Sequence, residues 1–186
     1  FDLGATGRVN SVVVTATSIY AAGSIATLNG SGISKIVKMK LDGTKDTTFS
    51  PPTINGSISS IIVENNNSVV MTGTFTTPAN RFMKLQSNGN LDTSFTIGSG
   101  LDDTGFSITK TSNGRYLVVG AFQRYRGSYT PTIVMINNTG THDTTFNIGT
   151  GLNVLGLCSY EQPDGKILIG GSFTDFNSND PFDSPD

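Results

Sequence analysis

The side chains that most often carry out catalysis are few and far apart in this 186-residue sequence. His142 is its single histidine and Cys158 its single cysteine. A nucleophile and its base must lie within hydrogen-bonding reach, but His142 belongs to a turn-like sequence and Cys158 to the apolar stretch VLGLCSY. We therefore predict no catalytic pair, a turn role for His142 in place of an apolar residue, and a buried structural role for Cys158. A single cysteine also excludes an intrachain disulfide and a cysteine-based zinc cluster.

Neighbouring carboxylates are the second arrangement that could do chemistry, because a pair of acids can hydrolyse a glycosidic bond. Asp102 and Asp103 in GLDDTG are the obvious candidates. Adjacent residues of an extended chain point to opposite sides, so this pair favours a solvated loop. The other acids mostly recur in turns, as structural residues would. We predict no enzyme, and keep as the alternative a glycan-active enzyme that uses loop carboxylates.

A calcium-type loop is the third possibility, at DFNSNDPFDSPD (175–186). Oxygen-bearing side chains stand at positions 1, 3, 5 and 12 of such a loop, namely Asp175, Asn177, Asn179 and Asp186. The glycine at position 6 and the closing glutamate are missing, and Pro181 interrupts the loop. The chain also repeats every 46–51 residues, and this stretch aligns with the variable loop that follows the second predicted strand of each repeat. Calcium is therefore a weak candidate, and we predict no metal and no cofactor.

The loop FQRYRGSYTP (122–131) is the most distinctive candidate for a binding surface. It combines planar guanidinium groups with aromatic rings: Arg124, Tyr125, Arg126 and Tyr129. Arginine and tyrosine are enriched at protein contacts, and aromatic faces suit sugar rings. The sequence predicts a contact site at the rim of the fold. The alternative is a surface loop whose tyrosine packs on its own repeat.

Composition then indicates which elements position these residues. Charged residues make up 14% of the chain, which has 22 glycines, 7 prolines and no tryptophan. This mixture favours short strands joined by tight turns over helices. The formal net charge of −2 gives no reason to expect a nucleic-acid partner. Apolar runs such as KILIGG (166–171) are too short to span a bilayer, so we expect no membrane insertion.

A short motif returns along the chain and divides it into units. KDTTF (45–49), LDTSF (91–95) and HDTTF (142–146) each end on a phenylalanine, and the chain opens on Phe1. These phenylalanines are 46–51 residues apart. They predict four repeats, the last incomplete, at approximately 1–48, 49–94, 95–145 and 146–186.

Each repeat contains the same parts in the same order. A first apolar strand is followed by a turn and by a second strand that ends in Gly-x-apolar, as at Gly73 to Phe75. The third strands alternate apolar and polar residues or are rich in β-branched residues: KIVKMKL (35–41), RFMKLQ (81–86) and TIVMIN (132–137). Asn-Gly and Asp-Gly pairs supply the positive φ of hairpin turns. The sequence therefore predicts an all-β chain.

About three and a half units of this size, with three clear strands and a short fourth, fit the blades of a β-propeller. One small sheet cannot bury both its faces, so the recurrent phenylalanine would fill the gap between neighbouring blades. The aspartate and threonine before it predict a turn that bonds its own backbone. The glycine of Gly-x-Phe would let two backbones approach closely.

The same residues resemble a known family. QPDGKILIGGSFTDFNS (162–178) and NRFMKLQSNGNLDTSF (80–95) are similar to the delta-sixty repeat, a β-propeller-like repeat of bacterial and some phage proteins. The first copy departs from the pattern at Ile25, where phenylalanine is expected, and the third at His142, where leucine is expected. The fourth copy stops before its third strand. The resemblance implies an extracellular or surface-exposed module without catalytic activity, and it brings no functional residues.

The resulting functional hypothesis is a non-enzymatic binding or structural scaffold. It would belong to a bacterial cell-surface or secreted protein, or to a phage virion appendage such as a tail or fibre. We expect a protein or glycan surface ligand and no nucleic acid. Because three and a half blades leave open faces, we also expect a larger array, closed by further blades of the same polypeptide or by neighbouring subunits.

Overall fold

The computed structural model describes residue 4 and residues 6–28 and 30–176, so Phe1 lies outside the described residues. Every regular element in this part of the chain is a β-strand. The first sheet contains β1 (Val9–Val14), β2 (Ser18–Gly23) and β5 (Ile36–Lys40), and the second contains β6 (Ile58–Val63), β7 (Val69–Gly73) and β8 (Phe82–Leu85). The third sheet contains β9 (Gly105–Lys110), β10 (Tyr116–Gly120) and β13 (Ile133–Ile136). The fourth contains β14 (Gly156–Glu161) and β15 (Ile167–Gly171).

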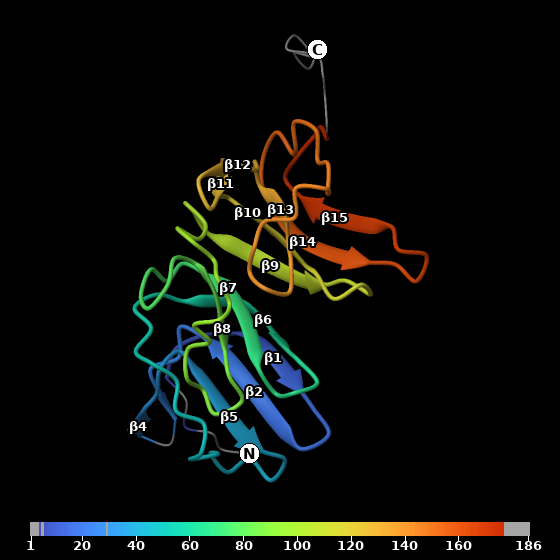
Figure 1. Cartoon of the computed structure of the whole chain (residues 1–186). Coiled ribbons are helices and arrows are strands. Elements are labelled where there is room, and N and C mark those ends of the chain that lie inside the picture. Colours follow the sequence, from blue (N-terminus) through green and yellow to red (C-terminus); the bar gives the residue numbers. More distant parts are fainter. Residues whose placement is uncertain (1–3, 5, 29, 177–186) are drawn as a thin grey trace.

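Strand order follows chain order, with antiparallel pairing and the second strand in the middle of each three-stranded sheet. That middle strand packs on both faces, which is why VVMTG in β7 and YLVVG in β10 are buried at every residue. The four sheets succeed one another along an open array, with β1, β6, β9 and β14 adjacent (Figure 1). This confirms the all-β prediction and a partial propeller. No helix in the described ranges is long and apolar enough to cross a membrane.

The expected short fourth strand is reduced to a single bridge in each complete repeat. The residue before the motif's aspartate pairs with the third strand in three places: Lys45 with Met39, Leu91 with Leu85, and His142 with Ile136. The backbone N–H of the following aspartate donates to the third strand once more, over 2.9 Å for each of Asp46, Asp92 and Asp143. Pairing then ends because the aspartate starts a turn.

The Asp-Thr-Phe motif forms the self-bonded turn that its sequence predicts. In each copy one aspartate oxygen accepts two hydrogen bonds from the residue two positions later. Asp143 Oδ1 accepts the Thr145 N–H over 3.0 Å and its hydroxyl over 2.6 Å. Asp46 with Thr48 and Asp92 with Ser94 repeat this arrangement within 0.1 Å. The turn aims the next phenylalanine between two sheets.

The recurrent phenylalanines fill the gaps between consecutive sheets. Phe49 is buried among residues of the first and second sheets, with its ring 5.8 Å from that of Tyr20. Phe95 is buried between the second and third sheets, where it meets Phe82 and Tyr116 at 5.6 and 6.0 Å. Phe146 is half-buried against the cluster between the third and fourth sheets. The inter-sheet role is confirmed for all three.

The glycine of each Gly-x-apolar sequence lets the end of the second strand approach the backbone at the start of the first strand closely. A β-carbon on Gly73 would overlap the carbonyl oxygen of Ser57, at the start of the same sheet. Gly23, Gly120 and Gly171 meet an equivalent carbonyl. Each of these positions coincides with a register shift between the first and second strands. The glycine is needed for this bulge, which lies within one sheet.

Hydroxyl side chains link the first strands of adjacent sheets. Ser11 Oγ accepts the N–H of Ile61 over 3.3 Å, and Ser60 Oγ accepts the N–H of Ile108 over 3.4 Å. Cys158 holds the corresponding place in the fourth sheet, and it is exposed. The prediction of a buried thiol is therefore wrong. Its stretch is apolar, but no sheet in the described part of the chain packs beyond β14.

Candidate binding surface

The candidate loop folds into a two-stranded hairpin, β11 (Arg124–Tyr125) and β12 (Ser128–Tyr129). Its two-residue turn places Arg126 and Gly127 at positive φ, 53° and 82°. Such a turn matches the twist of paired strands, and glycine lowers its cost. The loop is thus an ordered platform beyond the third sheet (Figure 1).

A side-chain clamp closes the base of this hairpin. Asp102 Oδ1 accepts the N–H groups of Gln123 and Arg124 over 2.8 and 2.9 Å. Asn55 and Asn153 make the same pair of contacts in the second and fourth sheets. We call these three residues the loop clamps. Their role was not predicted from the sequence, although each stands six or seven residues after a recurrent phenylalanine.

The loop clamp also explains the acidic pair at 102–103. Asp102 holds the hairpin, while Asp103 Oδ1 accepts the N–H of Thr104 over 2.6 Å. Each carboxylate is exposed and supports local backbone. The two act in separate contacts, in agreement with the expectation of a solvated structural loop.

Tyr125 does not present its ring at the surface. It is fully buried, and its hydroxyl donates to the carbonyl of Gly140 over 2.6 Å. Its ring packs edge-on against Phe82 and His142, and burial raises the pKa of its hydroxyl. The expectation that Tyr125 contributes to an exposed face is therefore wrong. Its alternation with the exposed Arg124 along a short strand turns it toward the core instead.

The other three candidate side chains are exposed. The Arg124 guanidinium lies over the Tyr129 ring, 5.9 Å from its centroid, and also donates to the Gly127 carbonyl. Tyr129 is 64% exposed. Arg126 donates to the carbonyl of Thr96, in the segment that follows Phe95. Arg124 and Tyr129 therefore form a planar pair that faces outward, whereas Arg126 secures the hairpin.

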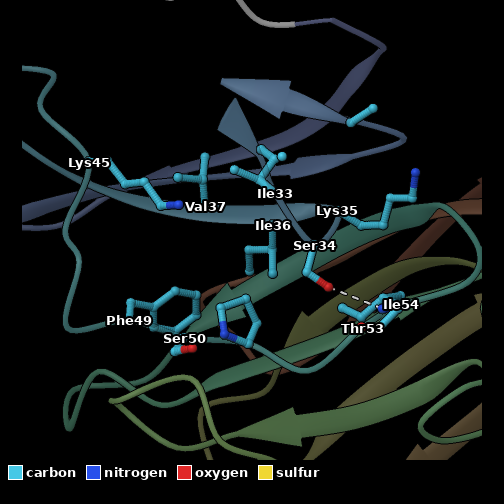
Figure 2. Close-up of a pocket in the computed structure, with 13 residues that line it drawn as sticks. Ile33, Ser34, Lys35, Ile36, Val37, Lys45, Phe49, Ser50, Thr53 and Ile54 are labelled. Atoms are coloured by element: carbon cyan, nitrogen blue, oxygen red, sulfur yellow. Dashed lines mark hydrogen bonds between the residues drawn. The ribbon is translucent and has the colours of Figure 1, made fainter. Parts of the chain in front are cut away.

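A groove recurs beside each inter-sheet joint. The first, of about 550 Å³, lies between the start of β5, the Asp-Thr-Phe turn and the segment after Phe49. Lys35 and Lys45 extend from its opposite ends, and Ser34 Oγ accepts the Ile54 N–H over 3.1 Å (Figure 2). Equivalent grooves of about 310 and 320 Å³ lie beside Phe95 and Phe146.

The three grooves differ in chemistry at one repeated position. Lys45, Leu91 and His142 each precede the motif's aspartate and line the local groove. Burial lowers the pKa of His142, although the negative charge of Asp143 acts to raise it. The lowered pKa favours the neutral imidazole at pH 7. The third groove also includes Tyr129, so the exposed Arg124–Tyr129 pair stands at its border.

The calcium candidate falls mostly outside the described residues, since Asn177, Asn179 and Asp186 belong to 177–186. Within the described ranges, the N–H of Asp175 donates to the loop clamp Asn153 over 3.3 Å. No group of three or more histidine, cysteine, aspartate or glutamate side chains in the described ranges could hold a metal ion.

These features define an open β-propeller repeat array with a rim of loops and grooves. The profile of a family described as "Domain of unknown function (DUF5122) beta-propeller" matches residues 18–49, 64–95, 111–146 and 162–182. The chain belongs to this β-propeller family. The first three matches end on Phe49, Phe95 and Phe146, the joints of the structure. The match confirms the expected kind of repeat under a description other than delta-sixty. No curated protein matches the chain.

Proposed function

We propose that this chain is a non-enzymatic β-propeller module that acts as a binding and structural scaffold. The observation that carries the proposal is the hairpin 122–131, which holds Arg124 and Tyr129 outward on a fixed base. The buried Tyr125 anchors the hairpin to the core, and the loop clamp Asp102 holds its first residues. A preorganised planar pair loses little freedom when it contacts a ligand, which favours recognition.

The hydrogen bonds of the acidic side chains support a scaffold over the alternative, a glycan-active enzyme. Asp46, Asp92 and Asp143 hold turns at the joints. Glu64 accepts from Tyr116 and pairs with Lys110 across two sheets, and Glu161 accepts from Ser112 in the same manner. General acid–base catalysis needs carboxylates that converge on a substrate. These carboxylates act in separate structural contacts.

The proposed ligand is a protein or glycan displayed on a surface. The proposed setting is a bacterial cell surface, a secreted protein or a phage virion appendage, and it rests on the resemblance to repeats of such proteins. Further blades of the same polypeptide or neighbouring subunits would complete the array.

The test is a binding screen of the whole chain against a glycan array and against bacterial envelope proteins. For a ligand that binds, we expect the double variant Arg124→Ala/Tyr129→Ala to weaken binding at least tenfold with an unchanged melting temperature. Ser128→Ala, on the same hairpin, is the matched control and should bind like the native chain. Unchanged binding by the double variant would refute the loop as the site. Time-dependent cleavage of a bound glycan would favour the enzyme.

A further inference from the structure

The third groove contains two polar side chains that the fold leaves without a partner. Thr130 Oγ1 and His142 Nδ1 are buried and form no hydrogen bond with the described residues. Both residues line the groove of about 320 Å³ beside Phe146, and Thr130 is only 2% exposed. Buried polar atoms of folded proteins are nearly always hydrogen-bonded. Two unpaired atoms in a single groove therefore point to a bound molecule that supplies their partners.

The repeat itself does not require polar residues at these two positions. A residue at positive φ comes directly before each third strand: Lys35, Arg81 and Thr132. Two positions earlier stand residues that each line the local groove: Ile33, Ala79 and Thr130. The second groove is thus apolar at both places, with Ala79 and Leu91, where the third groove has Thr130 and His142. The difference indicates a function that is specific to the third groove.

The third groove is built without any strand of the fourth sheet. Its lining ends at Ile148, before β14 begins at Gly156. The linings of the first and second grooves likewise end at Ile54 and Gly98, before the next sheet begins. All three grooves are therefore made by the same parts of a repeat, and they can be compared directly.

The remaining lining of the third groove is uncharged and largely apolar. No lysine, arginine, aspartate or glutamate is among the described residues that line it, whereas Lys35 and Lys45 flank the first groove (Figure 2). Apolar side chains supply much of the surface, among them Ile133, Met135 and Ile148. An ionised ligand would lose hydration here without gaining an opposite charge. A neutral ligand with hydrogen-bonding groups and an apolar face matches this chemistry.

Tyr129 is a wall that two pockets share. It lines the third groove and also a neighbouring pocket of about 260 Å³ that includes Gln123 and the loop clamp Asn153. We call the neighbour the clamp pocket. The Tyr129 ring is 64% exposed although Arg124 lies over it. The negative face of an aromatic ring attracts weakly positive C–H groups, such as those of a sugar ring. Two adjoining pockets with one aromatic wall fit a chain of linked rings.

We propose that the third groove, Tyr129 and the clamp pocket form a binding site for a neutral oligosaccharide. One sugar enters the groove and its hydroxyl groups bond with Thr130 and with the imidazole of His142. The adjoining sugar lies across Tyr129, toward Gln123. Sugar hydroxyls both donate and accept, so they suit a threonine hydroxyl and either tautomer of a neutral imidazole. The inference rests on the proposed function and deepens it, because it names the ligand class that the Arg124–Tyr129 pair recognises.

A peptide fits the groove less well than a sugar. Extended peptides are commonly recognised through unpaired backbone groups at the edge of a strand. Beside the third groove this edge of β13 is already in use. Ile136 forms a bridge with His142, and the Met135 carbonyl accepts the N–H of Asp143 over 2.9 Å. Recognition by side chains alone, as this groove offers, favours an oligosaccharide.

The test titrates the intact 186-residue chain with neutral oligosaccharides of glucose, mannose, galactose and N-acetylglucosamine, and with oligogalacturonate as the acidic comparison. By calorimetry we expect saturable binding of at least one neutral oligosaccharide, at least tenfold tighter than its monosaccharide and than oligogalacturonate. His142 is the single histidine, so the NMR signal of its ring C–H reports on the groove without ambiguity. This signal should shift along the same saturation curve. No binding of a neutral sugar at millimolar concentration, or binding without that shift, would overturn the proposal.

A groove variant tests the two unpaired side chains. Thr130→Ala/His142→Leu gives the third groove the two residues of the second. It should weaken sugar binding at least tenfold and keep or raise the melting temperature, because it removes buried polar groups that have no partner. Lys45→Leu, at the equivalent position of the first groove, is the matched control and should bind like the native chain. A lowered melting temperature with unchanged sugar affinity would show that the two groups serve the fold, and would overturn the proposal.

The hairpin variant Arg124→Ala/Tyr129→Ala separates this inference from the proposed function. A ligand whose binding is weakened by the hairpin variant and not by the groove variant would overturn the oligosaccharide site and leave the proposed function in place. An envelope protein that binds in this way would be such a ligand. Sugar binding that only the groove variant weakens would support the groove as the sugar site and would refute the hairpin as the binding surface.

Discussion

The joint at Phe95 and the joint at Phe146 use the same motif and the same positions but are filled differently. Phe95 is 7% exposed and contacts two aromatic rings. The third strands of the two adjoining sheets, β8 and β13, both contribute side chains to this joint. Phe146 is half-buried among aliphatic residues, and it lines an apolar hollow next to β15. The comparison teaches that the motif determines where its phenylalanine points. The neighbouring sheets determine how much that phenylalanine stabilises the array.

The largest expected difference between the joints is the cost of removing each ring. Phe95→Ala should lower the free energy of unfolding by about 3–5 kcal/mol, because it leaves a cavity in a closed core. Phe146→Ala should cost only about 1–2 kcal/mol, because part of its surface already meets solvent. Urea denaturation of both variants measures the two values. Equal costs would show that the two joints are energetically alike.

The turn aspartates should show a smaller difference. Asp143 also pairs with the guanidinium of Arg115, while Asp92 makes the same turn bonds without an ion pair among the described residues. Asp143→Ala should cost about 2–3 kcal/mol, because it leaves a partly buried cation without its partner. Asp92→Ala should cost about 1 kcal/mol, the value of the turn bonds alone. The double variant Arg115→Ala/Asp143→Ala is the control, and it should recover part of the larger loss.

Acid should destabilise the same turns, because their aspartates become protonated. The Thr145 hydroxyl and then Arg115 lower the pKa of Asp143 to about 2, from 3.8 in an unstructured chain. Because the folded value is the lower one, the stabilisation is present above about pH 4 and is lost as the pH falls toward 2. Denaturation midpoints between pH 5 and 2 test this. Asp143→Asn should flatten the pH dependence, and an unchanged slope would contradict the assignment.

Much of the fold could be predicted from the sequence because its local signals agree. The Asp-Thr-Phe motif indicated a turn, a joint and the length of a repeat, and the structure has all three. Cys158 shows where such reasoning fails, because an apolar stretch indicates a buried face only if another sheet covers it. The prediction that the Tyr125 ring is exposed was wrong for a related reason. Whether a loop residue points outward depends on the register of a two-residue strand, which composition does not determine.

The candidate surface was harder to predict than the fold. The loop clamps Asn55, Asp102 and Asn153 carry a recurrent signal, but their spacing from the phenylalanine varies between six and seven residues. The hollow beside β15 could not be located from sequence, because it depends on how residues of two different sheets come together.

The smallest effect on stability is expected at the first strands. In the native protein, the exposed Cys158 should react with a maleimide in native buffer. In the double variant Ser60→Cys/Cys158→Ser, the new thiol should react at least tenfold more slowly. Ser60 differs because its hydroxyl contacts the next sheet, at Ile108. The double variant Ser60→Cys/Cys158→Ser should keep a free energy of unfolding within about 1 kcal/mol of the native protein. Similar reaction rates would show that the second and third sheets separate readily.

The loop clamps have a consequence for engineering and for divergence. Each one fastens the first residues of a loop to the segment before its own sheet, so the tip beyond it can change length while the strands keep their register. A foreign epitope inserted between Arg126 and Gly127 would begin and end on a closed stem. Such a graft would be displayed as a constrained ring, and the three clamped loops of the array would offer three insertion sites for it.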